Sequence, residues 1–151
     1  MIGPPEEADV PALVDLLEQL DRFYGVTEFE PAGLRAKRVR DVLFGTPPAA
    51  HALVARDGGA LVGIATYSFH WPAKGLRTSV FMKDLFVAES HRGAGVGEQL
   101  VRALRAAAAE RGCGRVEWTV DSWNDGARRF YERLGARRDG RRFYRWDEPV
   151  D

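Results

Sequence analysis

The hydrophobic positions of the chain recur at helical spacing in four segments and form strand-like runs between them. Asp9 precedes the first helical pattern as a candidate N-cap, and four leucines share one face of that helix: Leu13, Leu16, Leu17 and Leu20. Glycines and prolines mark the ends of the patterns. The helices are predicted over residues 9–23, 32–44, 97–111 and 125–134.

Strand-like segments fill the intervals between the helices. They are predicted over residues 51–55, 60–71, 78–87, 115–120 and 141–146. Asp57-Gly58-Gly59 predicts a hairpin turn between the first two, and the first few residues, which include Pro4 and Pro5, give only a weak signal for an extra edge strand. This order of elements indicates an α/β (α+β) protein with helices packed on a sheet.

Length and charge exclude several classes of protein. The 151 residues fit one domain spanning residues 1–151. The chain has 22 Lys and Arg against 22 Asp and Glu, and this zero net charge argues against a nucleic-acid partner. No apolar run approaches the ~20 residues of a membrane span, and the start of the chain lacks a signal-peptide pattern. With one cysteine, Cys113, we expect a cytoplasmic protein that has no membrane partner and no internal disulfide.

The charges are unevenly distributed along the chain. Residues 1–30 hold eight acidic side chains and one basic one, whereas residues 126–145 hold eight arginines and two acidic side chains. The simpler interpretation is two solvated faces. The alternatives are that the two regions attract each other in the fold or that they serve ligands of opposite charge.

A glycine-rich segment, Arg92-Gly93-Ala94-Gly95-Val96-Gly97, lies between a predicted strand and a predicted helix. Glycines allow successive backbone N–H groups to converge, and the helix N-terminus adds a partial positive charge, so the segment suits a phosphate or pyrophosphate. The spacing matches neither a P-loop nor a dinucleotide fingerprint. The alternative is a plain tight turn that needs positive φ angles.

A second segment runs from Asn124 to Ala136 and contains a Phe130-Tyr131 pair. Helical spacing places both aromatic residues and Leu134 on one face. From periodicity alone, Tyr131 is most simply a core tyrosine whose hydroxyl is hydrogen-bonded.

Together, the two segments resemble the GNAT family of N-acetyltransferases. The acetyl-CoA signature R/Q-x-x-G-x-G/A of that family is matched by Arg92, Gly95 and Gly97, and its later Asn…Phe-Tyr…Gly signature by Asn124, Phe130, Tyr131 and Gly135. Nearly the whole chain resembles the spermidine/spermine (diamine) and thialysine branch. The resemblance implies a single GNAT-type domain with a central, mixed, mostly antiparallel twisted sheet of six to seven strands and about four helices.

The resemblance also implies acetyl-CoA as the cofactor, no metal, and transfer by direct attack of a primary amine on the thioester. The implied cofactor-binding residues are Leu85, Phe86, Val87, Arg92, Gly93, Ala94, Gly95, Val96, Gly97, Glu98, Asn124, Asp125, Gly126, Ala127 and Tyr131. Tyr131 is the implied general acid, because a tyrosine of pKa near ~10 stays protonated at neutral pH and can protonate a thiolate of pKa near ~8.5.

An attacking ammonium must first lose a proton, for which Asp84, Glu117 and Asp121 are candidate bases. The resemblance favours Asp84, which it places on the strand that faces the acceptor. The implied substrate-binding residues are Tyr24, Trp71, Lys83, Asp84, Glu117, Trp118, Thr119 and Asp139. The diamine branch carries two adjacent acids where this chain has Lys83-Asp84, and Tyr24 replaces an acid near the end of the first helix. A small primary amine is therefore expected as the substrate, either a diamine or polyamine or a lysine-like amino acid.

Two other functions stay open. One is a non-catalytic CoA-binding regulatory domain, and the other is an acetyltransferase of protein or peptide amines. The diamine branch also implies a homodimer. The three histidines lack the spacing of metal ligands.

Overall fold

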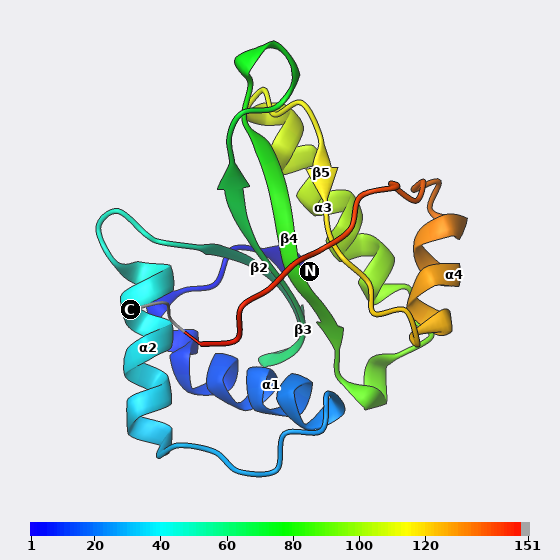
Figure 1. Ribbon diagram of the computed structural model, residues 1–151. Coiled ribbons are helices and arrows are strands. Elements are labelled where there is room, and N and C mark those ends of the chain that lie inside the picture. The colour runs from blue at the N-terminus through cyan, green and yellow to red at the C-terminus, as the bar shows by residue number, and fades with distance from the viewer. Residues whose placement is uncertain (149–151) are drawn as a thin grey trace. The chain divides into compact units, whose positions relative to one another are not determined.

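A five-stranded sheet with the order β1-β2-β3-β4-β5 forms the centre of the first of two units in the computed structural model (Figure 1). The structure describes residues 1–148, and its units are Met1–Thr119 and Val120–Asp151. The strands are β1 Ile2–Gly3, β2 His51–Asp57, β3 Ala60–His70, β4 Ser79–Val87 and β5 Val116–Glu117. The helices are α1 Val10–Phe23, α2 Ala32–Phe44, α3 Val96–Glu110 and α4 Asp125–Arg133, with short 3-10 turns η1 Glu7–Asp9, η2 Lys74–Leu76 and η3 Glu89–His91.

The sheet is mixed and mostly antiparallel, as predicted. Each neighbouring pair from β1 to β4 is antiparallel, and β4 pairs with β5 in parallel. A bulge interrupts the register of β3 and β4, because Thr66 lies opposite Asp84 while Tyr67 lies opposite Met82. Lys83 is the extra residue on β4.

The predicted number of strands, six to seven, is too high. The segment 141–146 is not a strand, and β5 has two residues in place of the predicted 115–120. Alternation gave 141–146 a strand pattern, but its side chains stay exposed, including Phe143 and Tyr144. A strand is stabilised by a partner and a buried face, and this segment has no ladder partner among the described residues. The weak edge strand does form, since Pro4 and Pro5 follow its last paired residue, Gly3.

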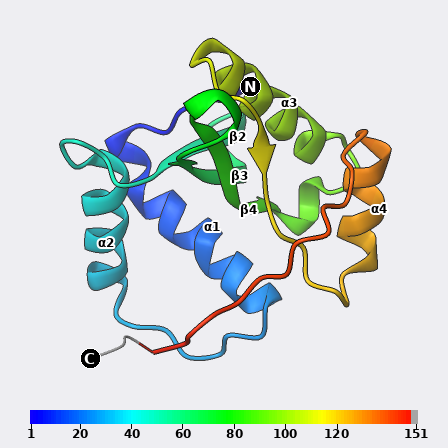
Figure 2. The same ribbon diagram turned by 45° about the horizontal axis from the view of Figure 1, so that its top comes forward.

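One face of the sheet packs against α1 and α2. Leucines of α1 contact β2, β3 and β4 in a buried cluster: Leu13, Leu16, Leu20, Ala52, Val54, Ile64 and Phe86. Val39, Leu43 and Phe44 of α2 pack against the same cluster. Figure 2 shows α1 and α2 side by side on this face. Asp9 precedes α1 as predicted, but its carboxylate accepts from the Glu6 N–H (2.7 Å) and from Arg56 on β2 instead of capping α1.

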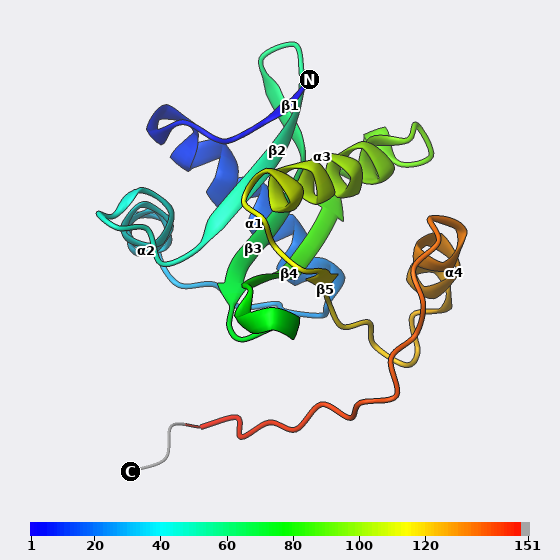
Figure 3. The same cartoon turned by 90° about the horizontal axis from the view of Figure 1, so that it is seen from above.

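The opposite face packs against α3 (Figure 3). The predicted apolar stripe of α3 is confirmed, with Leu100, Leu104 and Ala108 all buried. Gly63 on β3 permits the close approach, because a Cβ built there would lie 3.1 Å from Leu100 Cδ1 and 3.2 Å from Val96 Cγ1. The first turn of α3 therefore rests directly on the β3 backbone.

Candidate active site

Strand β4 has an open edge beyond its short pairing with β5. The parallel pairing joins Val80 to Val116 and Phe81 to Glu117, so Met82–Val87 have no strand partner on that side within residues 1–148. Figure 1 shows the short β5 beside only the first part of β4. An unpaired strand edge presents backbone N–H and C=O groups that can pair with an extended, amide-bearing ligand. Leu85, Phe86 and Val87 of the predicted cofactor site lie on this part of β4.

The glycine-rich segment, which we call the anion loop (Arg92–Glu98), connects η3 to the first turn of α3. Gly93 and Gly95 have φ angles of +78° and +82°, in the region that favours glycine, and Gly95 is the N-cap of α3. Glycine has no side chain to cap the helix, and the first N–H groups of a helix have no intrahelical partner. The turn with positive φ angles is therefore confirmed, and the anion site at the helix N-terminus stays a prediction.

Arg92 anchors the anion loop to the end of β4. Its Nε donates to the Val87 carbonyl at 2.9 Å, and its guanidinium lies over the rings of Phe86 (5.3 Å) and Phe23 (5.7 Å). At the helix start, Glu98 accepts from Arg102 at 2.6 Å. These contacts hold Arg92 against the end of β4, next to the backbone groups of the anion loop.

Asp84 is a partly buried acid on β4, and the groups around it shift its pKa in opposite directions. Its N–H donates to Thr66 Oγ1 at 3.1 Å, and the same hydroxyl lies 3.5 Å from Asp84 Oδ2. Burial raises the pKa of Asp84, and this is the largest effect. The positive charge of Lys83 and the hydrogen bond from Thr66 lower the pKa, whereas the negative charge of Asp21 raises it. The net result is a pKa above the usual value. A carboxylate with a raised pKa is a better proton acceptor than a solvated one.

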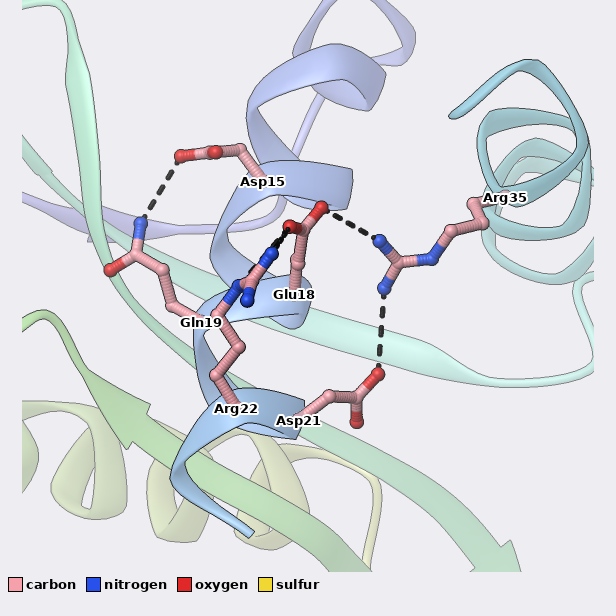
Figure 4. Close-up of polar contacts among 6 residues, drawn as sticks. All are labelled: Asp15, Glu18, Gln19, Asp21, Arg22 and Arg35. Atoms are coloured by element: carbon pink, nitrogen blue, oxygen red, sulfur yellow. Dashed lines mark hydrogen bonds and ion pairs between the residues drawn. The ribbon is translucent and has the colours of Figure 1, made fainter. Parts of the chain in front are cut away.

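Beside this strand, the acidic end of α1 is neutralised by arginines, as Figure 4 shows. Arg35 of α2 bridges Glu18 (3.0 Å) and Asp21 (3.4 Å), and Arg22 lies 2.7 Å from the other oxygen of Glu18. The guanidinium groups of Arg22 and Arg35 also lie 4.6 and 4.7 Å from the centre of the Phe29 ring. Much of the N-terminal acidic charge is thereby paired within the protein.

The remaining predicted substrate residues of the first unit lie on or directly after β3, β4, β5 and α1. Tyr24 follows α1 and is half exposed, and Trp71 follows β3 with its Nε1 donating to the Leu76 carbonyl. Lys83 is exposed on the bulge and forms no ion pair in the described part of the chain. Glu117 lies on β5, 3.1 Å from Arg115, and is followed by Trp118 and Thr119.

The second motif lies in the second unit and is described by itself. Asn124 is the N-cap of α4, with its Oδ1 accepting from the Ala127 N–H at 3.1 Å. Asp125 and Gly126 open that helix, and Asp125 pairs with Arg128 at 2.7 Å. Tyr131 is partly buried beside Phe130, with ring centroids 5.1 Å apart. Asp121 precedes the helix, while Asp139 lies beyond it, 3.9 Å from Arg141.

The Acetyltransferase (GNAT) family profile matches residues 13–136, which cover both motifs. The chain belongs to this family. It is 27% identical over 145 residues to a thialysine N-epsilon-acetyltransferase of Bos taurus, covering 90% of this chain and 83% of that protein. It is also 34% identical over 76 residues to an L-ornithine N5-acetyltransferase of Arabidopsis thaliana, covering 50% of this chain and 33% of that protein.

A solved structure of an integron cassette protein from Vibrio cholerae has the same fold. Its TM-score is 0.88 at 30% sequence identity, over 98% of this chain and 92% of that one. The predicted GNAT-type fold and the assignment of the chain to the N-acetyltransferases are therefore confirmed. No helix in the described residues is long and apolar enough to cross a membrane, and those residues hold no group of three or more His, Cys, Asp or Glu arranged to bind a metal.

The sequence did not single out Thr66, Asp21 or Arg35, which set the surroundings of Asp84 and of the α1 end. Thr66 lies on a different strand, 18 residues away, and only the register of β3 and β4 brings it to Asp84. Arg35 carries no local signal either, because one arginine on an arginine-rich helix is indistinguishable from its neighbours until the helices pack.

Proposed function

We propose that this GNAT-family protein is an acetyl-CoA-dependent N-acetyltransferase of small primary amines, and that a lysine-like or ornithine-like amino acid fits better than a polyamine. The observation that carries the acceptor class is the presence, at consecutive positions of β4, of a partly buried acid, Asp84, and an exposed cation, Lys83, that forms no ion pair in the described residues. The same proposal includes a homodimer in the cytoplasm, by analogy with the diamine branch.

The residues present fit an acyl-CoA molecule. The open edge of β4 at Leu85–Val87 offers backbone groups to the amides of a pantetheine arm. The anion loop offers N–H groups at a helix N-terminus to a pyrophosphate. Asn124–Ala127 would complete the cofactor site, with the N-cap interaction of Asn124 fixing the start of α4. When bound, acetyl-CoA would supply the activated acetyl thioester.

Asp84 is the proposed proton acceptor for the acceptor amine. An alkylammonium of pKa ~10.4 is about one part in a thousand neutral at pH 7, so a nearby base lowers the barrier. Of the candidate bases, Asp84 has the pKa raised by burial, whereas Glu117 is paired with Arg115. The hydroxyl of Tyr131 is the proposed proton donor to the departing sulfur.

The acceptor class follows from charge pairing. Asp84 is suited to an ammonium group, and Lys83 is suited to a carboxylate, so the pair matches a zwitterion. A polyamine would meet the charge of Lys83 with repulsion. The acids at the end of α1 add little attraction for a polycation, because Arg22 and Arg35 pair with them.

The test is a thiol-release assay with acetyl-CoA and a panel of lysine, thialysine, ornithine, putrescine, spermidine, aminoglycosides and peptides. We expect turnover with the amino acids, loss of most kcat in Tyr131→Phe and Asp84→Asn, and unchanged CoA affinity in both variants. Lys83→Glu should raise KM for amino acids and lower it for diamines. Turnover on spermidine alone would overturn the acceptor assignment.

The two alternatives give different results in the same assay. A regulatory CoA-binding domain would bind CoA saturably without acetyl transfer to any amine. An acetyltransferase of protein amines would act on the peptides and not on free amino acids. Unchanged kcat in Tyr131→Phe would remove Tyr131 from the mechanism.

A further inference from the structure

A hydrogen-bonded triplet joins the β2–β3 hairpin to the turn that precedes the anion loop. His91 Nε2 lies 2.9 Å from Asp57 Oδ2, and His91 Nδ1 lies 2.8 Å from Ser90 Oγ. Asp57 is the last residue of β2, whereas Ser90 and His91 belong to η3. The contact therefore links two segments that are 34 residues apart in the chain.

Both ring nitrogens of His91 are engaged, which fixes the side chain. The Asp57 carboxylate only accepts hydrogen bonds, so Nε2 carries the proton when the ring is neutral, and the Ser90 hydroxyl donates to Nδ1. These two hydrogen bonds set the orientation of the ring.

The part of the anion loop that precedes Val96 has little packing to hold its shape. Gly93, Ala94 and Gly95 are exposed, and a Cβ built at Gly93 or Gly95 would meet no atom within 4 Å. The side-chain contacts that hold the start of the loop come from two consecutive residues. His91 connects it to the hairpin, and Arg92 connects it to the Val87 carbonyl of β4.

We propose that Asp57, His91 and Ser90 act as positioning residues for the anion loop, holding its backbone N–H groups in the arrangement that binds the pyrophosphate of acetyl-CoA. This inference rests on the proposed function. A loop that is already ordered binds its ligand without a further loss of conformational entropy, so the triplet affects cofactor affinity and leaves the chemical step unchanged.

The test compares Asp57→Ala, His91→Ala and the double variant by calorimetric titration with CoA and by steady-state kinetics. We expect a rise of about threefold to tenfold in the Kd for CoA and in the KM for acetyl-CoA, the size expected for one lost hydrogen bond. The kcat and the KM for the acceptor should not change. The Kd for CoA of the double variant should be no higher than that of either single variant, because both substitutions remove the same interaction. Asp57→Asn keeps an acceptor oxygen and should retain most of the affinity.

The sign of the effect separates positioning from bulk electrostatics. Removing the negative charge of Asp57 would by itself favour an anionic ligand, so weaker CoA binding in Asp57→Ala requires loss of loop order. Glu89→Gln is the matched control, since Glu89 is an exposed acid of the same turn, and it should bind CoA as well as the wild type or slightly better.

Three results would overturn the inference while the proposed function stands: unchanged CoA affinity in Asp57→Ala and His91→Ala, additive losses in the double variant, or an equal loss in Glu89→Gln. Absence of CoA binding to the wild-type protein would instead overturn the proposed function, and this inference with it. Thermal unfolding of each variant shows whether a loss of affinity comes from a loss of folded protein.

Discussion

Replacing Gly63 by alanine tests whether the close contact of β3 with α3 determines both stability and the position of the anion loop. The added Cβ would lie 3.1 Å from Leu100 Cδ1, 3.2 Å from Val96 Cγ1 and 3.4 Å from Ala55 Cβ. Carbon atoms in contact prefer separations of about 3.5–4.0 Å, so each distance is too short by roughly 0.1–0.9 Å. Leu100 is fully buried and cannot move into solvent.

The cost can be worked from this geometry. Overpacking of a well-packed core costs about 1–3 kcal/mol. Alanine in a strand recovers roughly 0.5–1 kcal/mol of backbone entropy relative to glycine, which leaves a net destabilisation of about 0–2.5 kcal/mol, with a central value of ~1 kcal/mol. For a chain of this length, each 1 kcal/mol lowers Tm by roughly 2–4 °C. We therefore expect Gly63→Ala to lower Tm by several degrees.

The same substitution should weaken CoA binding, because Val96 lies in the first turn of α3, directly after the N-cap Gly95. The measurements are thermal unfolding and calorimetric titration with CoA. The control is Gly33→Ala in α2, where an added Cβ meets nothing within 4 Å and alanine favours the helix by up to about 1 kcal/mol. An unchanged or raised Tm in Gly63→Ala would refute the packing argument, and a lowered Tm with unchanged CoA affinity would separate α3 packing from the anion loop.

Two further predictions concern pH and are measured by denaturant unfolding across a pH series. Burial raises the pKa of Asp84, so the folded state binds its proton more tightly than the unfolded state, and stability falls as pH rises through the range between the two pKa values. Asp84→Asn should therefore be more stable than the wild type at pH 7, with a gap that closes toward acid; a less stable variant would contradict this. Burial, and then the charge of Arg111, lower the pKa of His51, so stability should fall as pH drops below the unfolded pKa of ~6.5, and His51→Gln should flatten that slope.

Elements with a strong periodic signal were predictable from the sequence. The helix at residues 10–23 and the helix at 96–110 follow leucine stripes whose members are buried as expected, except for Leu17, which is partly buried. The hairpin at Asp57–Gly59 follows a turn signal of two glycines. Local patterns were sufficient here because each element buries the face that its own sequence defines.

Features that depend on partners were not predictable. The bulge at Lys83 depends on the register between β4 and β3. The length of β5 depends on how far it pairs with β4, and that pairing covers two residues. Residues 141–146 show the converse, since a strand pattern formed no strand. In the candidate site, the motif residues were found by resemblance. The contacts of Thr66 with Asp84 and of His91 with Asp57 were not, because the partners are 18 and 34 residues apart in the chain.

The uneven charge along the chain has a different meaning once the contacts are known. From the sequence, the acids of residues 1–30 could attract a cationic substrate, but Asp9 pairs with Arg56, Glu18 with Arg22 and Arg35, and Asp21 with Arg35. Much of that charge therefore stabilises the packing of α1 against its neighbours and contributes little to the field at a distance. Asp84 follows Lys83 and forms no ion pair with an arginine within residues 1–148, so we propose it as the acid of the candidate site that meets an ammonium group. A substrate that brings its own carboxylate satisfies both residues, and for this reason we place the amino acids ahead of the polyamines.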